Sequence, residues 1–242
     1  MPISWAITDL TTNEVAECIQ ESDAVLVPIG AVEQHGPSCP VGTDMILAQY
    51  IAPRVAEAAN ILYGPVLPVG DSLVFTSFPG TIALRPSTLF AATVDYVTSL
   101  HRAGFRRFLM LGTHWDNHFP VAAAMSELAD SLPEMRFAIK DFWEFSLVQK
   151  IMQEEFDEAG GHADAADVAM LLAIDQSYVR QELLTAEFPP VKYQVGRTLL
   201  RQFMTESGVI GSDQRKATVE AGERLIEAVI DGYLAVIEDL RH

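Results

Sequence analysis

The stretch that decides the fold runs from Ala24 to Asp44 and reads AVLVPIGAVEQHGPSCPVGTD. Its first six residues, Ala24–Ile29, are apolar and predict a buried strand. The loop after this strand carries a carboxylate, an imidazole and a second carboxylate, from Glu33, His35 and Asp44. Such a group is costly to bury unless a positive charge lies between its members. A divalent metal ion is the simplest such charge, because zinc, manganese and iron all accept these nitrogen and oxygen donors.

The spacing within this loop favours a common direction for its donors. Glu33 and His35 are two residues apart, so an extended backbone directs both side chains to the same side. Gly36 and Pro37 predict a turn that folds the donors toward one another. Asp44 stands at the start of the next predicted helix, where a carboxylate also interacts well with the helix dipole. A simple N-cap is therefore the alternative interpretation of Asp44.

A second polar loop, THWDN at Thr113 to Asn117, follows the apolar run from Phe108 to Leu111. It carries His114 and Asp116, which again are two residues apart. A lone histidine is more often structural than a ligand, but here the polar patch interrupts an apolar run, and this favours ligation. His118 is interpreted as a helix start or as support for the ligands. Two matching loops predict one metal centre with one or two ions.

A third cluster, GGHADAAD, begins at Gly160 and ends at Asp167. We expect a helix that starts at His162, with Asp167 about a turn and a half later. The alternative is a capped helix with an exposed histidine. Beside the two loops, His162 becomes the best candidate for a general acid/base, because its charge changes near neutral pH.

Strand-like and helix-like segments alternate along the chain, and this predicts an α/β fold with a mostly parallel sheet covered by helices on both faces. The predicted strands are Ala24–Ile29, Ile61 to Val69, Arg107 to Leu111 and Arg136 to Lys140. The predicted helices are Asp44 to Ala59 (with Thr43 or Asp44 as N-cap), Pro86–Ala103, Phe119 to Ser131, Ala163 to Ile174 and Ala217 to Leu240. Both donor loops follow strands, and sites in such sheets gather at the carboxyl ends of the strands.

Length and composition exclude several classes of protein. The 242 residues suit one domain, and 49% hydrophobic residues are ample for its core. A net charge of −17 argues against nucleic-acid and anionic-membrane partners. The first residues, Met1 to Leu10, do not resemble an export signal, and no apolar run is long enough to cross a membrane. The least regular segment, Glu187 to Gly211, is expected to cover a neighbouring element or a subunit contact.

The chain contains only two cysteines, Cys18 and Cys39. This number rules out a disulfide framework and fits a reducing cytoplasm. Cys39 lies inside the first loop, where it is either a further metal ligand or a small half-buried side chain; we favour the second.

These motifs together resemble those of the creatininase family of metal-dependent amidohydrolases. The family's E-x-H-G-P-H/S-x-P-x-x-T-D loop matches EQHGPSCPVGTD, from Glu33 to Asp44. Its F-P-G-T, its H-G-G-N or H-Y-E-N loop and its H-A-G-x-x-E-T-S segment correspond to the stretches that begin at Phe78, His114 and His162. The family ends in a G-V-x-G motif, similar to Gly208 to Gly211, and an A-T-x-E-x-G motif, similar to the stretch with Ala217, Glu220 and Gly222. The resemblance therefore extends from about Val27 to Leu225.

The resemblance implies an α/β fold with a two-metal site, usually in a hexamer or a smaller ring-like homo-oligomer. Carried over to this chain, one ion is held by Glu33, Asp44 and His114. The other is held by His35, Asp44 and Asp116, with Asp44 bridging the two. The resemblance implies that a hydroxide between the metals would attack a carbonyl carbon. His162 passes the proton to the leaving group and is oriented by Asp167.

The chain departs from the family pattern at three places. Family members often carry E-H ahead of F-P-G-T, where this chain has Val74 and Phe75. Asp116 stands where creatininase has Glu, and Asp167 likewise replaces Glu. These two replacements keep the charge but shorten the reach, so creatinine itself need not be the substrate.

The leading hypothesis is a metal-dependent hydrolase that opens a small cyclic amide or a related carbonyl compound. An alternative is cleavage of a C–C bond in an oxidised cyclitol, such as a diketo-inositol, by the same metal-bound hydroxide. Aromatic pocket walls, for example from Trp115, Phe142 and Trp143, favour the planar amide, and polar walls favour the polyol. A hypothesis from another class is a non-catalytic metal-binding assembly protein, which a closed site with every metal position filled by protein would support.

Overall fold

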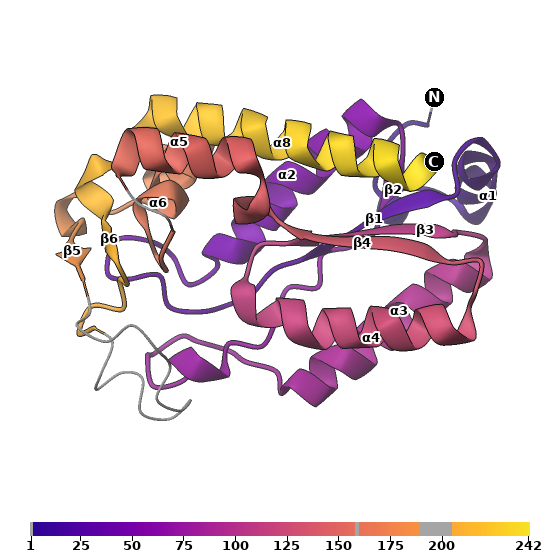
Figure 1. Ribbon diagram of the computed structural model, residues 1–242, viewed down its shortest axis with the longest axis horizontal. Helices are drawn as coiled ribbons and strands as arrows, with labels where there is room; N and C mark the ends of the chain where they lie inside the picture. Colours follow the sequence, from indigo (N-terminus) through magenta and orange to yellow (C-terminus); the bar gives the residue numbers. More distant parts are fainter. Residues whose placement is uncertain (1, 158–159, 189–204) are drawn as a thin grey trace.

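The computed structural model describes residues 2–157, 160–188 and 205–242. Its main sheet is parallel and has the order β2-β1-β3-β4 (Figure 1). The strands are β1 (Ala24–Ile29), β2 (Leu62–Tyr63), β3 (Arg107–Gly112) and β4 (Arg136–Asp141). Ile29 pairs with Gly112 and Gly112 with Asp141, so the carboxyl ends of β1, β3 and β4 lie side by side.

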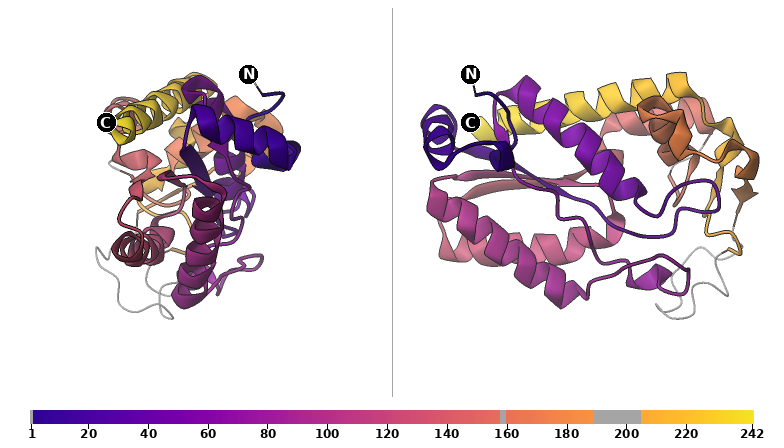
Figure 2. Two further views of the ribbon diagram at one scale, coloured as in Figure 1. Left: turned by 90° about the vertical axis from the view of Figure 1, so that its right-hand side faces the viewer. Right: turned by 180° about the vertical axis from the view of Figure 1, so that it is seen from behind.

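Helices cover both faces of this sheet, which confirms the predicted α/β architecture (Figures 1 and 2). One layer contains α2 (Thr43–Ala59), α5 (Ser146–Phe156), α6 (Ala165–Ile174) and α8 (Val219–Arg241). The other contains α1 (Thr12–Glu21), α3 (Pro86–Ala103) and α4 (His118–Ser131). A small antiparallel pair, β5 (Ala186–Glu187) and β6 (Ser212–Asp213), lies apart from the main sheet.

The burial of β1 explains why its sequence is apolar without alternation. Leu26 packs into the core that α2 and α8 share, whereas Val25 and Val27 pack into the core beneath α3 and α4. All six residues of the strand are buried. A parallel strand with a helical layer on each face needs an apolar side chain at every position.

Two elements differ in length or start from the sequence prediction. The second strand was expected from Ile61 to Val69, but only Leu62 and Tyr63 form the ladder, and Leu67 pairs with Ile29 in an isolated bridge. Pro65 and Pro68 follow, and proline has no N–H to donate to a neighbouring strand. The predicted helix from Ala163 begins at Ala165 instead, so His162 is not its first residue.

The caps also differ from the prediction, and two helices were not predicted. Neither Thr43 nor Asp44 is the N-cap of α2, because the helix begins at Thr43 and Gly42 precedes it without a side-chain cap. The side chain of Asp44 is therefore available to the site. The unpredicted helices α1 and α5 are short; α1 has a capping box between Thr11 and Glu14 that the sequence contains in plain form.

Short 3-10 segments complete the described chain: η1 (Ile7–Asp9), η2 (Leu73–Phe75), η3 (Trp115–Asn117), η4 (Phe142–Glu144), η5 (Gln176–Tyr178), η6 (Gln181–Leu183) and η7 (Gln214–Lys216). Of the irregular segment predicted between Glu187 and Gly211, residues 189–204 lie outside the described residues. Among the helices that the structure describes, none is both long enough and apolar enough to cross a bilayer.

Candidate metal centre

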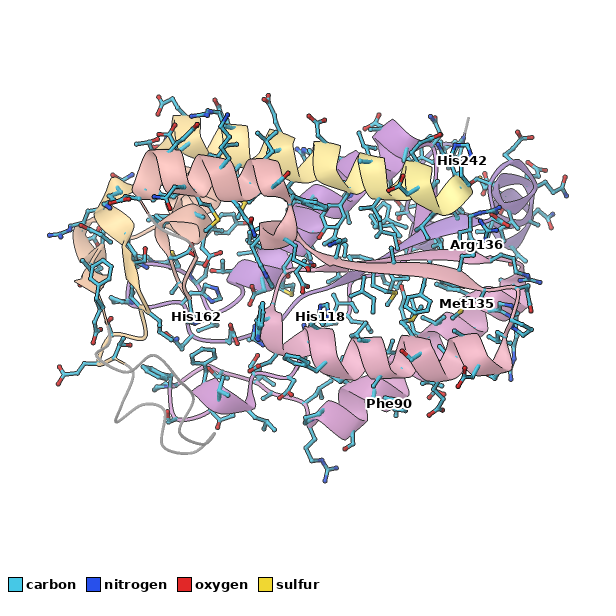
Figure 3. The ribbon with its side chains drawn as sticks, in the orientation of Figure 1. Phe90, His118, Met135, Arg136, His162 and His242 are labelled. Carbon is cyan, nitrogen blue, oxygen red and sulfur yellow. The ribbon has the colours of Figure 1, made fainter. Side chains whose placement is uncertain are left out.

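A cavity of about 430 Å³ opens at the carboxyl end of the sheet. The loop after β1 contributes Glu33 and His35 to its lining, the first turn of α2 contributes Asp44, and the loop after β3 contributes His114. His162 approaches from the segment before α6, as its position beside the sheet edge in Figure 3 shows. The topology thus brings together donors that are separated by up to about half of the chain.

Three histidines of this cavity are held in the same way. Nδ1 of His35 lies 3.2 Å from the carbonyl oxygen of Glu33, Nε2 of His114 lies 2.8 Å from that of Asp71, and Nε2 of His162 lies 2.9 Å from that of Gln34. A carbonyl oxygen can only accept, so each of these nitrogens is the protonated donor. The other nitrogen of each ring therefore faces inward, which is the usual arrangement of metal-ligating histidines.

The inward nitrogens meet carboxylate oxygens. Nδ1 of His114 is 3.0 Å and Nδ1 of His162 is 3.5 Å from Oε1 of Glu33. Nε2 of His35 is 3.9 Å from Oδ1 of Asp44. A lone pair that faces a carboxylate is repelled unless a proton or a metal ion lies between them. Each pair therefore calls for a positive charge inside the cluster.

Two buried oxygens support the same conclusion. Oε2 of Glu33 and Oδ2 of Asp44 have no hydrogen-bond partner among the described residues, and both side chains are almost fully buried. A buried carboxylate oxygen without a partner costs several kcal/mol on the order-of-magnitude scale of desolvation. Divalent cations bind these oxygens together with imidazole nitrogens, so the donors present fit a metal ion.

The protonation of the protein without metal follows from the same environment. Burial raises the pKa of Asp44 to about 8 and that of Asp167 to about 7. Burial also opposes the charge of His114, but the adjacent Glu33 outweighs it and raises the pKa of His114 to about 10. Burial lowers the pKa of His162 to about 3, so its inward nitrogen carries a free lone pair at neutral pH. The charge of His162 therefore does not change near neutral pH, contrary to the expectation from the sequence. Protons thus occupy positions that a metal ion would take.

The donors form two overlapping groups whose ligand atoms lie within 4.8 Å of one another. One group is Glu33, Asp44 and His114, and the other is Glu33, His35 and His162. The first is the set expected to hold one metal. For the second metal, His35 and Asp44 approach each other, but Asp116 lies in the cavity wall and belongs to neither group.

Asp167 faces a different neighbour from the one expected. Its Oδ2 lies 3.9 Å from Nε2 of His35 and accepts the backbone N–H of Asp164 in the capping box of α6. The residue that holds the ring of His162 is instead Gln34, through its backbone carbonyl. Sequence reasoning could not identify this partner, because a backbone carbonyl leaves no residue-type signal.

Two amides that hold the loops together were also not predicted. Asn117 donates to the carbonyl of Gly30 and accepts the N–H of Asp71, which ties the first and second loops to the chain beyond β2. Gln214 donates to the carbonyl of Ala163 and accepts from Ser38. The first loop and the segment of His162 are therefore fixed to each other.

Aromatic side chains line the outer part of the cavity. Trp115 and Trp143 have ring centroids 6.1 Å apart, and both line the wall as expected. Nε1 of Trp143 is buried and has no hydrogen-bond partner among the described residues. Phe75, which was not predicted at the site, stacks on His162 with ring centroids 4.1 Å apart.

Two further candidate residues, His118 and Cys39, have contacts that favour a structural role. His118 begins α4, one of the two roles considered for it (Figure 3), and its Nδ1 lies 2.8 Å from Oδ2 of Asp141. It is not among the residues that line the cavity. Cys39 packs against Val168 and Leu171, and burial raises the pKa of its thiol to about 12. A thiol that stays protonated is a poor ligand, so the packing role of Cys39 is favoured.

Comparison with known proteins identifies the family of this chain. The sequence profile of the creatininase family, described as creatinine amidohydrolase, matches residues 8–237. The creatinine amidohydrolase of Pseudomonas putida is 28% identical over 99% of this chain and 98% of its own length. The 3-dehydro-scyllo-inosose hydrolase of Thermotoga maritima is 23% identical over 96% of this chain and 82% of its own length.

A solved structure of creatinine amidohydrolase has the same fold as this chain. The two superpose with a TM-score of 0.88 and 23% identity, over 98% of each chain. The family profile spans both donor loops, the segment of His162 and most of α8. The chain therefore belongs to the creatininase family of hydrolases.

Proposed function

We propose that the chain is a metal-dependent amidohydrolase that opens a small cyclic amide. The observation that carries the proposal is the set of inward-facing imidazole nitrogens opposite buried carboxylate oxygens without partners. In this proposal Glu33, Asp44 and His114 hold one ion, and His35, Asp44 and Asp116 hold the other. Zinc and manganese are the first ions to test, because a creatininase mutant has been solved in a Zn–Zn form and creatininase in a manganese form.

The residues of the chain have separate roles in this reaction. When bound, the ions supply Lewis acidity toward the carbonyl and lower the pKa of water. His162 offers a lone pair at Nδ1, 3.5 Å from Glu33, while Gln34 holds its other nitrogen as a donor. This imidazole can take a proton from water and return it to the leaving nitrogen. Trp143 offers an unpaired N–H to a polar atom of the substrate.

The cavity walls favour a planar amide over a polyol. Beyond the donor residues, the apolar side chains that line the cavity are Val74, Phe75, Trp115, Phe142, Trp143, Met152 and Ile210. A cyclitol carries an oxygen on each ring carbon, and each oxygen placed against such a wall loses its hydrogen bonds to water. A flat ring with one carbonyl and an apolar edge loses far fewer hydrogen bonds to water at the same wall.

The test is the metal content of wild-type protein beside Asp44→Ala, measured by elemental mass spectrometry after incubation with zinc or manganese. We expect about two ions per chain in the wild type and loss of both in the variant, since Asp44 is assigned to both ions. Glu57→Ala, at an exposed acid of the same helix, is the matched control and should keep both ions. A wild type that binds well below one ion per chain under these conditions would contradict the proposal and leave a non-catalytic scaffold.

The second candidate, hydrolysis of an oxidised cyclitol, is favoured by the relative from Thermotoga maritima that carries this activity in its name. The metal-loaded protein should therefore be assayed with cyclic amides and with cyclitol ketones in parallel. Turnover of the ketones alone would select this candidate. The proposal also includes a cytoplasmic location, for which the two unpaired cysteines are the support, and a hexameric homo-oligomer, which sedimentation would test.

A further inference from the structure

We infer that Phe75, with Val74 and Ile210, selects substrates whose cyclic amide carries an apolar substituent close to the scissile bond. This inference rests on the proposed function, because it places the amide at the donor cluster. It adds a specificity-determining wall that the metal-binding motifs do not contain.

The wall is built against His162 itself. The ring of Phe75 lies nearly parallel to that of His162, with centroids 4.1 Å apart and an angle of 16° between the planes. His162 also meets the ring of His35, with centroids 4.8 Å apart. The imidazole of His162 therefore contacts both Phe75 and a metal-site histidine.

Ile210 is held beside His162 by backbone hydrogen bonds. Its N–H and carbonyl pair with those of His162 in an isolated antiparallel bridge, at 2.9 and 3.1 Å. Val74 and Phe75 are buried, and they form one apolar cluster with Ile210 and Phe78. Because Val74, Phe75 and Ile210 also line the cavity, hydrocarbon lies directly beside the group that transfers the proton.

This placement determines which part of the substrate meets the wall. The leaving nitrogen must come within hydrogen-bond reach of Nδ1 of His162 for proton transfer. Substituents beside the scissile C–N bond, on the acyl carbon or on the nitrogen, then come close to Phe75, which stacks on this ring, and to Val74, which packs with Phe75. An apolar substituent there gains about fourfold in affinity for each methylene removed from water. A hydroxylated substituent loses affinity, since the wall side chains cannot hydrogen-bond.

The test uses two metal-chelating probes, acetohydroxamate and phenylacetohydroxamate, on the zinc-loaded protein. Both bind metal through the same group, but only the second extends a phenyl ring from it. We expect phenylacetohydroxamate to bind at least about tenfold more tightly in titration calorimetry, as burial of an aromatic ring would give. Phe75→His should reduce this ratio to about threefold or less, with zinc content and acetohydroxamate affinity retained.

Two further variants make the result specific. Phe75→Leu keeps an apolar side chain and should retain most of the ratio, and it also shows whether the segment folds with a smaller residue. Phe90→His makes the same exchange at a half-buried side chain of α3 that does not line the cavity, so its ratio should equal that of the wild type. Equal affinity for both probes in the wild type, or an unchanged ratio in Phe75→His, would overturn the inference while the metal site stands. Failure to bind zinc and both probes would refute the proposed function, and the inference with it.

Discussion

The donor geometry is compatible with two roles for His162, metal ligand and proton carrier. His162 belongs to a group of possible ligands with Glu33 and His35, yet it also has the free lone pair that a proton carrier needs. We predict that His162→Ala retains about two ions per chain while turnover falls by about 10²–10⁴-fold, the usual contribution of a general acid/base. Metal analysis and steady-state kinetics on the same preparation test this. Loss of one ion would make His162 a ligand, and near-normal turnover would remove it from the mechanism.

At Trp143 the contribution of the aromatic ring can be measured separately from that of the indole N–H. Trp143→Phe keeps an aromatic wall but removes the buried Nε1, which has no partner among the described residues. One hydrogen bond to a neutral group contributes about 0.5–1.5 kcal/mol, so we expect KM to rise by about 2- to 10-fold with metal content unchanged. Trp5→Phe, outside the cavity lining, is the control and should leave KM as it is. An unchanged KM in Trp143→Phe would limit Trp143 to packing.

The donor side chains could be predicted from the sequence, but the groups that hold them in place could not. Glu33, His35 and Asp44 stand in one short loop, so their types and spacing show directly in the sequence. The carbonyls that fix the histidine tautomers come from the backbone, and no residue type marks them. Phe75 was noted only as a departure from a motif, because a stacking contact between distant segments has no spacing rule.

Among the elements, the contact between α6 and α8 has the least room. A Cβ added to Gly222 of α8 would lie 1.9 Å from the carbonyl oxygen of Ala169 in α6. We predict that Gly222→Ala lowers the free energy of unfolding by about 1–3 kcal/mol, as overpacking does. Urea unfolding followed by circular dichroism measures this. Glu223→Ala, at the next and exposed position of the same helix, should change stability by less than about 0.5 kcal/mol.

The same contact connects the packing of α8 to the site, because α6 carries Asp167 in its first turn. If the two helices separate in Gly222→Ala, Asp167 should move away from His35, and turnover should fall along with stability. A variant as stable as Glu223→Ala would show that α8 tilts without cost and that the close approach is not needed.

Elements with a strong pattern were predicted well and those with broken patterns were not. β1, β3 and α3 follow uninterrupted apolar runs or clear start and stop signals, and their observed bounds agree with the prediction to within one residue. β2 was too long in the prediction, because an apolar run continued through Pro65 and Pro68. The start of α6 was too early because Asp164, two residues after His162, forms the cap.

The order of strands in the parallel sheet determines which loops lie next to each other. Once β1 and β3 are neighbours, the loops after them must share one edge, so the pairing of Glu33 with His114 was predictable. The segment of His162 is not attached to the main sheet. Its place depends on Ile210 and Gln214 from a distant part of the chain, which the sequence pattern could not supply.

The buried donors also give the metal-free protein a defined pH dependence. Burial raises the folded-state pKa of Asp44 from 3.8 to about 8 and that of Asp167 from 3.8 to about 7. Between its unfolded and folded pKa values such a carboxyl binds more protons in the folded state, so stability falls as pH rises. His114, raised from 6.5 to about 10 by Glu33 against the effect of burial, acts in the same direction above pH 6.5. His162, lowered by burial from 6.5 to about 3, acts in the opposite direction, but only below pH 6.5.

We therefore predict that the melting temperature of the protein in a chelator falls as pH rises from about 6.5 to about 8, where every one of these contributions has the same sign. Saturating zinc should raise the melting temperature by more at the upper pH, because the metal competes with fewer bound protons there. Asp44→Asn cannot ionise at this position, so its metal-free melting temperature should depend less on pH. Circular dichroism melts with and without zinc measure all three trends. A metal-free melting temperature that rises over this interval would mean that the buried carboxyls are already ionised, and that a cation other than a proton accompanies them through purification.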